Sequence, residues 1–127
     1  MASSRRSHRL RVAVVGATGV AGQQFLASLG GHPWFELKRL AASERSAGKS
    51  FGDAIKDPAT GAIRWFCDRP CPAAFLKLQV ELAEDLRLDD VDLVFTALEA
   101  DAAKALEPRF AQRVPVISTA GAFRYEE

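Results

Sequence analysis

The sequence predicts an α/β fold with a mainly parallel sheet and helices on both faces. Short apolar runs rich in β-branched residues recur along the chain, amphipathic segments alternate with them, and a glycine-rich turn joins the first run to the first helix. Strands that alternate with helices in this way build βαβ units, whose crossovers are almost always right-handed and leave the strands parallel.

The first βαβ unit has the clearest signals. Residues 10–15 form a short apolar run typical of a strand buried on both faces, and Gly16 ends it. A helix follows from about Val20, ends at Gly30-Gly31, and is followed by a second strand over 35–42. The apolar stripe that predicts this helix consists of Phe25, Leu26 and Leu29.

The middle of the chain is less regular. Residues 43–62 carry Ser, Gly, Lys, Asp and Pro, which predicts an irregular loop. A short strand is expected near 78–82, followed by a polar turn or short helix through 85–90.

The pattern becomes regular again in the last third. Residues 91–98 predict a buried strand, and 99–112 predict a helix that we expect Pro108 to kink or split. Residues 114–118 predict a final strand, with Pro115 at its start.

Composition sets the broad class. The chain has 127 residues with 17 basic and 16 acidic side chains, which fits one globular domain and gives no reason to expect nucleic acid or a membrane as partner. We expect residues 1–9 to be a disordered lead-in and 10–127 to be a nucleotide-binding domain. There is no signal-peptide core, so the expected location is cytoplasmic. Cys67 and Cys71, without a second cluster, predict reduced thiols and no metal site.

The turn after the first strand reads Gly16-Ala-Thr-Gly19-Val-Ala-Gly22, a variant of the dinucleotide-binding fingerprint. Gly16 would allow a tight turn, Gly19 would let a pyrophosphate approach the backbone, and Gly22 would let the helix pack closely on the strand. The helix N-terminus would then face the phosphates. A tight turn without a ligand is the alternative, but the flanking strand and helix favour nucleotide binding. Residues 48–50 (Gly-Lys-Ser) lack the upstream glycine and strand of a P-loop.

Parallel sheets bind ligands beyond the carboxyl ends of their strands. The predicted strands end at Gly16, Ser43, Thr96 and Thr119, so these residues are expected at one edge of the sheet although they lie far apart in the sequence.

The second strand end indicates which cofactor binds. NAD sites place a carboxylate there to bind the ribose 2′-hydroxyl, and positions 41 to 43 carry none. Ser43 and Ser46 can donate hydrogen bonds and Arg45 can pair with a 2′-phosphate, so we predict NADP over NAD. Glu44 would favour a hydroxyl if its side chain pointed inward.

Five blocks together resemble the aspartate-semialdehyde dehydrogenase family. The most specific is Ala-Ala-Ser-Glu-Arg-Ser-Ala-Gly-Lys, whereas 51–90 match poorly. The resemblance covers most of this chain but only about the first third of a family enzyme. The blocks are 14–23, 32–37, 41–49, 94–98 and 122–127.

The resemblance implies three groups of cofactor contacts and one substrate contact. Arg124 matches the arginine that binds the phosphate of the substrate, whereas Thr119 replaces the asparagine usual in the family. The cofactor contacts are Gly16, Ala17, Thr18, Gly19 and Val20 for the pyrophosphate, Ser43, Arg45 and Ser46 for the 2′-phosphate, and Thr96, Ala97 and Leu98 for the nicotinamide ribose.

The resemblance also implies a reaction. Family enzymes reduce L-aspartyl-4-phosphate to L-aspartate-4-semialdehyde for lysine, threonine and methionine synthesis, using a cysteine nucleophile, a histidine acid/base and hydride transfer with NADP. Both catalytic residues are expected beyond Glu127, so this chain is expected to hold no catalytic residue and to be inactive alone, and the full enzyme is expected to be a homo-oligomer. The alternatives are N-acetyl-γ-glutamyl-phosphate reductase and a non-catalytic nucleotide-binding or association module.

Overall fold

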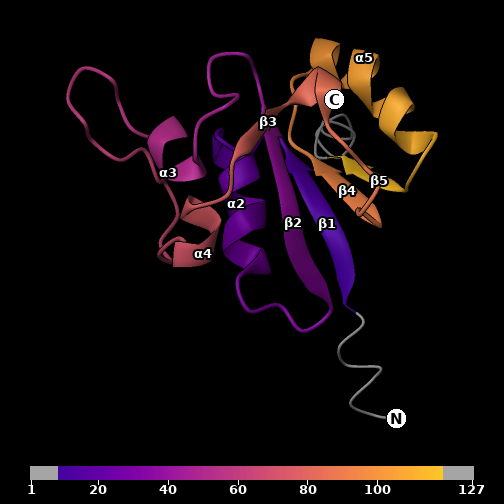
Figure 1. Ribbon diagram of the computed structural model, residues 1–127, viewed down its shortest axis with the longest axis horizontal. Helices are drawn as coiled ribbons and strands as arrows, with labels where there is room; N and C mark the ends of the chain where they lie inside the picture. The colour runs from indigo at the N-terminus through magenta and orange to yellow at the C-terminus, as the bar shows by residue number, and fades with distance from the viewer. Residues whose placement is uncertain (1–8, 119–127) are drawn as a thin grey trace, which may run out of the picture.

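The computed structural model describes residues 9–118 of the chain (Figure 1). The predictions for residues 1–8, Thr119 and Arg124 lie outside this range. The elements in chain order are β1 (Leu10–Val15), α2 (Val20–Leu29), β2 (Phe35–Ala42), α3 (Phe51–Ala54), α4 (Ala73–Leu76), β3 (Val80–Leu82), the 3₁₀ turn η1 (Ala83–Asp85), β4 (Leu93–Thr96), α5 (Ala100–Ala111) and β5 (Val116–Ser118).

The strands form one sheet in the order β3-β2-β1-β4-β5, and each neighbouring pair is parallel. The order reverses direction between β1 and β4, which is the point at which such sheets bind ligands. The predicted Rossmann-like α/β class is therefore confirmed.

Helices cover both faces of the sheet, as predicted. Because side chains alternate along a strand, β1 sends Val12 and Val14 to the face covered by α2 and α3, and Ala13 and Val15 to the face covered by α5. Each face has its own apolar core. Leu26, Leu40 and Phe51 belong to the first core, and Val94, Leu106 and Phe110 belong to the second.

The first βαβ unit matches its prediction in all three elements. β1 lies between β2 and β4, so both of its edges are paired, and Val12 to Val15 are completely buried although Leu10 at its start is exposed. This burial explains why its sequence is a continuous apolar run instead of an alternating one.

The segment 43–62 is not an irregular loop throughout, which corrects the prediction. It contains α3, whose start is capped by the Ser50 hydroxyl accepting from the Asp53 N–H at 3.2 Å. Phe51 and Ile55, one helical turn apart, are buried and attach this short helix to the core. An antiparallel bridge between Lys56 and Ile63 closes the arm that extends beyond α3 in Figure 1. Helix α4 was also not predicted.

Strands β3 and β4 are shorter than the predicted ranges 78–82 and 91–98. The N–H of Val80 donates to the carbonyl of Lys49, and the carbonyl of Val80 accepts from the Gly48 N–H, so the loop before α3 covers the outer edge of β3. After β3 the chain forms η1 and then a turn, which agrees with the predicted polar turn or short helix.

Pro108 does not split α5, which runs continuously from Ala100 to Ala111. The proline lies in the last turn on the exposed side, where the carbonyl left without its N–H partner can bond to water. The buried side of the helix carries Ala103, Leu106 and Phe110.

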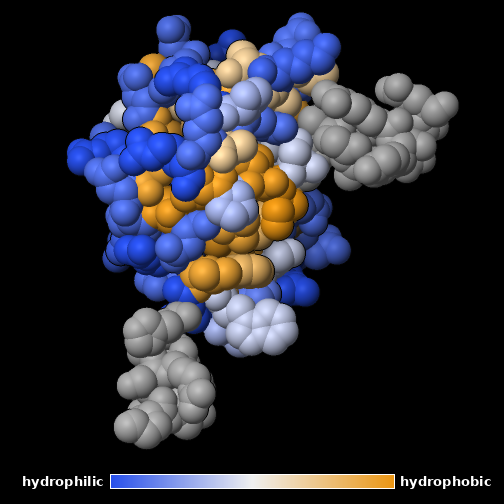
Figure 2. All heavy atoms as spheres, turned by 90° about the vertical axis from the view of Figure 1, so that its right-hand side faces the viewer, coloured by the Kyte–Doolittle hydropathy of each residue, from blue (hydrophilic) through white to orange (hydrophobic). Residues whose placement is uncertain are grey.

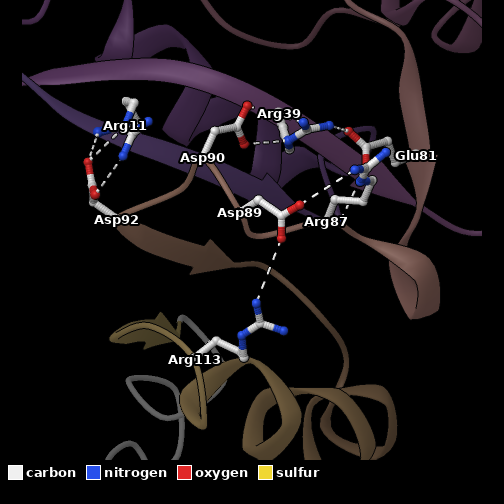
Figure 3. A network of polar contacts seen from close by, with 8 residues as sticks. All are labelled: Arg11, Arg39, Glu81, Arg87, Asp89, Asp90, Asp92 and Arg113. Carbon is white, nitrogen blue, oxygen red and sulfur yellow. Dashed lines mark hydrogen bonds and ion pairs between the residues drawn. The ribbon is translucent and has the colours of Figure 1, made fainter.

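Polar side chains attach the connection between β3 and β4 to the sheet (Figure 3). Arg39 on β2 pairs with Glu81 on β3 and with Asp90, both at 2.7 Å, and Arg11 on β1 pairs with Asp92 at 3.2 Å. These partners lie between 42 and 81 residues apart in the sequence.

The end of the sheet that carries β5 is apolar at its surface (Figure 2). Ile117 on β5 is 48% exposed and pairs in register with the buried Phe95 on β4. Among the described residues, no helix has both the length and the apolar character that crossing a bilayer would require.

Candidate functional site

The glycine turn lies at the carboxyl edge of the sheet, between β1 and α2. Gly16 has φ +84°, a left-handed conformation that side chains rarely adopt. A Cβ at this position would also lie 2.5 Å from the carbonyl oxygen of Ala97. Only glycine satisfies both constraints, so the predicted tight turn is confirmed.

The other two glycines of the motif differ in what surrounds them. A Cβ on Gly22 would lie 2.0 Å from the Gly16 oxygen, so α2 can approach β1 only with glycine here, as predicted. A Cβ on Gly19 would meet only that same oxygen, at 3.8 Å. The space beside Gly19 is therefore open, and a ligand can approach the backbone there.

The N-terminus of α2 is open to an anion. The first N–H groups of a helix have no acceptor inside the helix. In α2 no side chain caps them and the first turn contains no acidic residue. The positive end of the helix dipole therefore meets solvent beside Gly19 and the exposed Val20, which suits a phosphate.

Not every amide of the turn faces this opening. The N–H groups of Gly16 and Ala17 both donate to the Ala41 carbonyl on β2, at 2.8 and 3.2 Å, and the Ala17 side chain is buried. Gly19 donates to the Gly16 carbonyl at 3.3 Å. Among the predicted pyrophosphate contacts, Ala17 therefore has neither a side chain nor an N–H group that faces a ligand: the side chain is buried, and the N–H donates to the Ala41 carbonyl.

A polar hollow of about 780 Å³ lies between the glycine turn and the loop that follows β2. The loop is a tight turn in which Ser46 and Ala47 both donate to the Ser43 carbonyl at 3.0 Å. The structure therefore brings the predicted 2′-phosphate residues together beside Thr18. The hollow also contains Glu84, which the sequence did not indicate. Its lining is Thr18, Ser43, Glu44, Arg45, Ser46 and Glu84.

The segment after β4 crosses directly over the turn. The Ala97 N–H donates to the Val15 carbonyl at 2.9 Å, and a Leu98 methyl group lies 3.5 Å from the Cβ position of Gly16. Thr96 has a different environment from its two neighbours, because its buried hydroxyl donates to the Glu107 carboxylate on α5.

Gln23 is the residue of this region to which the sequence analysis assigned no role. Its side chain is completely buried on α2. Its amide nitrogen donates to the carbonyls of Thr18 at 3.2 Å and Arg64 at 2.7 Å, and its oxygen accepts from the Phe66 N–H at 2.8 Å. Its position one turn before Leu26, on the apolar side of the helix, was the available signal.

The two cysteines are free thiols, as predicted. Burial raises the pKa of Cys67 and raises that of Cys71 to about 11. Neither is a thiolate at neutral pH, so neither has the activation that a nucleophilic cysteine needs.

The arrangement can therefore bind a phosphorylated dinucleotide. The open helix N-terminus suits a pyrophosphate, the hollow offers hydroxyls and one guanidinium to an adenosine ribose, and Ala97 and Leu98 continue the surface along the strand ends.

Comparison with known proteins agrees with this geometry. The family model described as "Semialdehyde dehydrogenase, NAD binding domain" matches residues 11–127. An aspartate-semialdehyde dehydrogenase of Methanothermobacter thermautotrophicus is 41% identical over 92% of this chain, and that of Saccharomyces cerevisiae is 36% identical over 90%. The chain spans 31% and 29% of the length of these two relatives.

Solved structures show the same fold. The crystal structure of aspartate-semialdehyde dehydrogenase with NADP from Candida albicans superposes with a TM-score of 0.77 at 33% identity, covering 94% of this chain and 32% of that one. Because the family model spans nearly the whole sequence, this chain belongs to the semialdehyde dehydrogenases and carries their NAD binding domain.

Proposed function

We propose that this chain is the NADP-binding part of an aspartate-semialdehyde dehydrogenase. The whole enzyme would reduce L-aspartyl-4-phosphate to L-aspartate-4-semialdehyde in the cytoplasm, as a step toward lysine, threonine and methionine. The observation that carries the proposal is the polar hollow beside an uncapped helix N-terminus. The identity to aspartate-semialdehyde dehydrogenases supports the choice of substrate.

The chain's residues would divide the cofactor among them. The N–H groups of Thr18 and Val20 would donate to the pyrophosphate, and Gly19 would let it approach the backbone. Gly16 and Ala17, whose N–H groups both donate to the Ala41 carbonyl, would fix the turn. Ala97 and Leu98 would border the nicotinamide ribose, and the backbone of Thr96, the last residue of β4, would place them there. When bound, the nicotinamide supplies hydride.

Preference for NADP would come from the loop after β2. Arg45 would pair with the 2′-phosphate, and the hydroxyls of Ser43 and Ser46 would donate to it. Glu44 and Glu84 line the same hollow, and carboxylates there favour a ribose hydroxyl, so the preference for a 2′-phosphate depends on the Arg45 guanidinium and the two serine hydroxyls. We expect Arg45→Ala to weaken NADP⁺ binding about tenfold, by removing a charge-assisted hydrogen bond, while NAD⁺ binding changes less than about twofold.

Calorimetric titration of both cofactors tests this preference. The matched control is Lys49→Ala, which removes an exposed basic residue of the same loop that does not line the hollow. Equal affinity of the unmodified chain for NADP⁺ and NAD⁺, or equal losses in the two variants, would contradict the assignment.

A separate expectation concerns turnover. Residues 1–127 alone should show no phosphate-dependent oxidation of L-aspartate-4-semialdehyde, because the thiols of Cys67 and Cys71 are protonated and no family cysteine motif surrounds them. Arg124 would bind the substrate phosphate only in the whole, homo-oligomeric enzyme. Spectrophotometric assay of NADPH formation checks this, with the full-length relative from Saccharomyces cerevisiae as the positive control.

A further inference from the structure

We infer that Gln23 is a positioning residue for the cofactor, which keeps the glycine turn in its phosphate-binding conformation and couples it to the segment 64–66. The inference rests on the proposed function, since it concerns the same nucleotide site. Gln23 faces inward from α2 and does not itself line the hollow.

The hydrogen bonds define the orientation of this side chain. Its nitrogen has two carbonyl partners, Thr18 and Arg64, and its oxygen has an N–H partner, Phe66. Only the NH₂ group can donate to two carbonyls, and only the oxygen can accept, so a flipped amide would break all three contacts.

The contact with Thr18 controls the peptide bond between Thr18 and Gly19. The carbonyl of that peptide bonds to Gln23, and its N–H bonds to the Gly16 carbonyl. Both ends are therefore held, and the Thr18 oxygen points into the protein. If this peptide rotated, the oxygen would turn toward the open space beside Gly19, where an acceptor would repel a phosphate.

The contacts with Arg64 and Phe66 come from a segment 41 and 43 residues later in the sequence. The ring of Trp65, between them, packs edge-on against the buried Phe51 with centroids 6.3 Å apart. The segment 64–66 thereby holds the Gln23 side chain in place. A change in the conformation of the glycine turn or of the segment 64–66 would therefore affect the other through the Gln23 side-chain amide.

The test compares Gln23→Glu with Gln24→Glu. Both variants add one carboxylate to the same turn of α2, but residue 24 is exposed and residue 23 is buried against the carbonyls of Thr18 and Arg64. An ionised carboxylate cannot donate to either carbonyl. We expect Gln23→Glu to raise the Kd for NADP⁺ about tenfold or more near neutral pH, and Gln24→Glu to change it less than about threefold.

A pH series separates positioning from general damage. At about pH 5 a buried carboxyl group is largely protonated and can donate one hydrogen bond, so the ratio of the Kd of Gln23→Glu to that of the unmodified chain should fall. Taking the ratio removes the titration of the cofactor's own 2′-phosphate. A folded Gln23→Glu variant that binds like the unmodified chain, or an equal loss in both variants, would overturn the inference.

Hydrogen exchange on the unmodified chain provides a second measurement that needs no variant to fold. Adding NADP⁺ should slow hydrogen exchange at the amides of residues 19–22 and also at the Phe66 amide, whose N–H donates to the Gln23 side-chain oxygen. Slower exchange at 19–22 with no change at Phe66 would overturn the coupling. If the unmodified chain bound no NADP⁺ at all, the proposed function would fail and this inference with it, whereas binding that is insensitive to Gln23 removes the inference alone.

Discussion

The unit β1–α2–β2 and the connection from β2 to β4 are stabilised in different ways. The first is stabilised by buried apolar side chains and by two glycines that allow close backbone contact. The second contains two four-residue helices and a three-residue strand, and it is held against the sheet by polar contacts to distant residues in addition to buried Phe51, Ile55 and Val80. The comparison indicates that the glycine turn of the nucleotide site is determined by the local sequence, whereas the segments packed around it are held by partners that lie far away in the sequence.

The largest expected effect comes from breaking the close packing of the first unit. Gly22→Ala would place a methyl group 2.0 Å from the Gly16 oxygen, and the other atoms it would meet are also backbone atoms of Gly16 and Ala17, which cannot move aside as the end of a flexible side chain could. We expect a loss of about 3 kcal/mol in the free energy of unfolding, and a fall in Tm of about 10 °C or more. Thermal denaturation followed by circular dichroism measures it.

Gly19→Ala is the matched control within the same turn. Its Cβ would meet only one atom, at 3.8 Å, and its φ of −82° is allowed for alanine. We expect a stability loss of only about 0.5 kcal/mol, because alanine is a poor N-cap, together with weaker NADP⁺ binding. Equal destabilisation by the two substitutions would show that the contact at Gly22 does not set the position of the helix.

A smaller effect is expected from breaking the second region. Arg39→Met removes the pairs with Glu81 and Asp90 while keeping most of the apolar stem (Figure 3). The partners are about a quarter exposed, so solvent weakens the interaction only in part. We expect a loss of about 1 to 2 kcal/mol in the free energy of unfolding, measured by urea denaturation.

Arg87→Met serves as the comparison for that experiment. Its pair with Asp89 is 3.5 Å long, and both side chains are about two-thirds exposed or more. A loss below about 0.5 kcal/mol is expected. If this variant were as unstable as Arg39→Met, attachment of the β3–β4 connection would not depend on the pairs that cross from the sheet.

How far the sequence predicted the fold follows the same division. The local sequence of residues 10–42 was enough to predict its secondary structure. Central strands produce apolar runs, helices produce apolar stripes, and Gly16 and Gly30-Gly31 mark the turns. All three elements of this unit were predicted with their observed bounds. The helix 99–112 was predicted within one residue at each end for the same reason.

The arm and α3 were not predicted, because their stability comes from contacts that a local pattern does not contain. Phe51 looks isolated in a polar segment until the fold places Trp65 against it, and Gln23 looks like a surface residue until Arg64 and Phe66 reach it. Glu84 enters the hollow only because η1 follows a strand paired with β2. The sequence therefore predicted the residues that line the hollow, except Glu84, but not the distant contacts that hold α3 and Gln23.

The smallest expected effect is the response of the second region to acid. The Arg39 guanidinium, by hydrogen bonding to Asp90, lowers the pKa of that carboxyl group, and the Arg11 side chain lowers the pKa of Asp92 in the same way. Because these pKa values are lower in the folded state, both groups stabilise the fold above the unfolded pKa of about 3.9. That contribution is lost as the pH falls through the folded values.

Urea midpoints should therefore stay level from neutral pH to about pH 5 and then fall below about pH 4. Asp92→Asn isolates one part of this decline. An asparagine oxygen can still accept from the Arg11 N–H, which Asp92 accepts at 2.9 Å, but it carries no charge to titrate. The variant should be slightly less stable near neutral pH and lose less stability on acidification. An acid response identical to that of the unmodified chain would assign the decline to other carboxyl groups, of which Asp57 also has a lowered pKa, through its hydrogen bond from the Ala59 N–H.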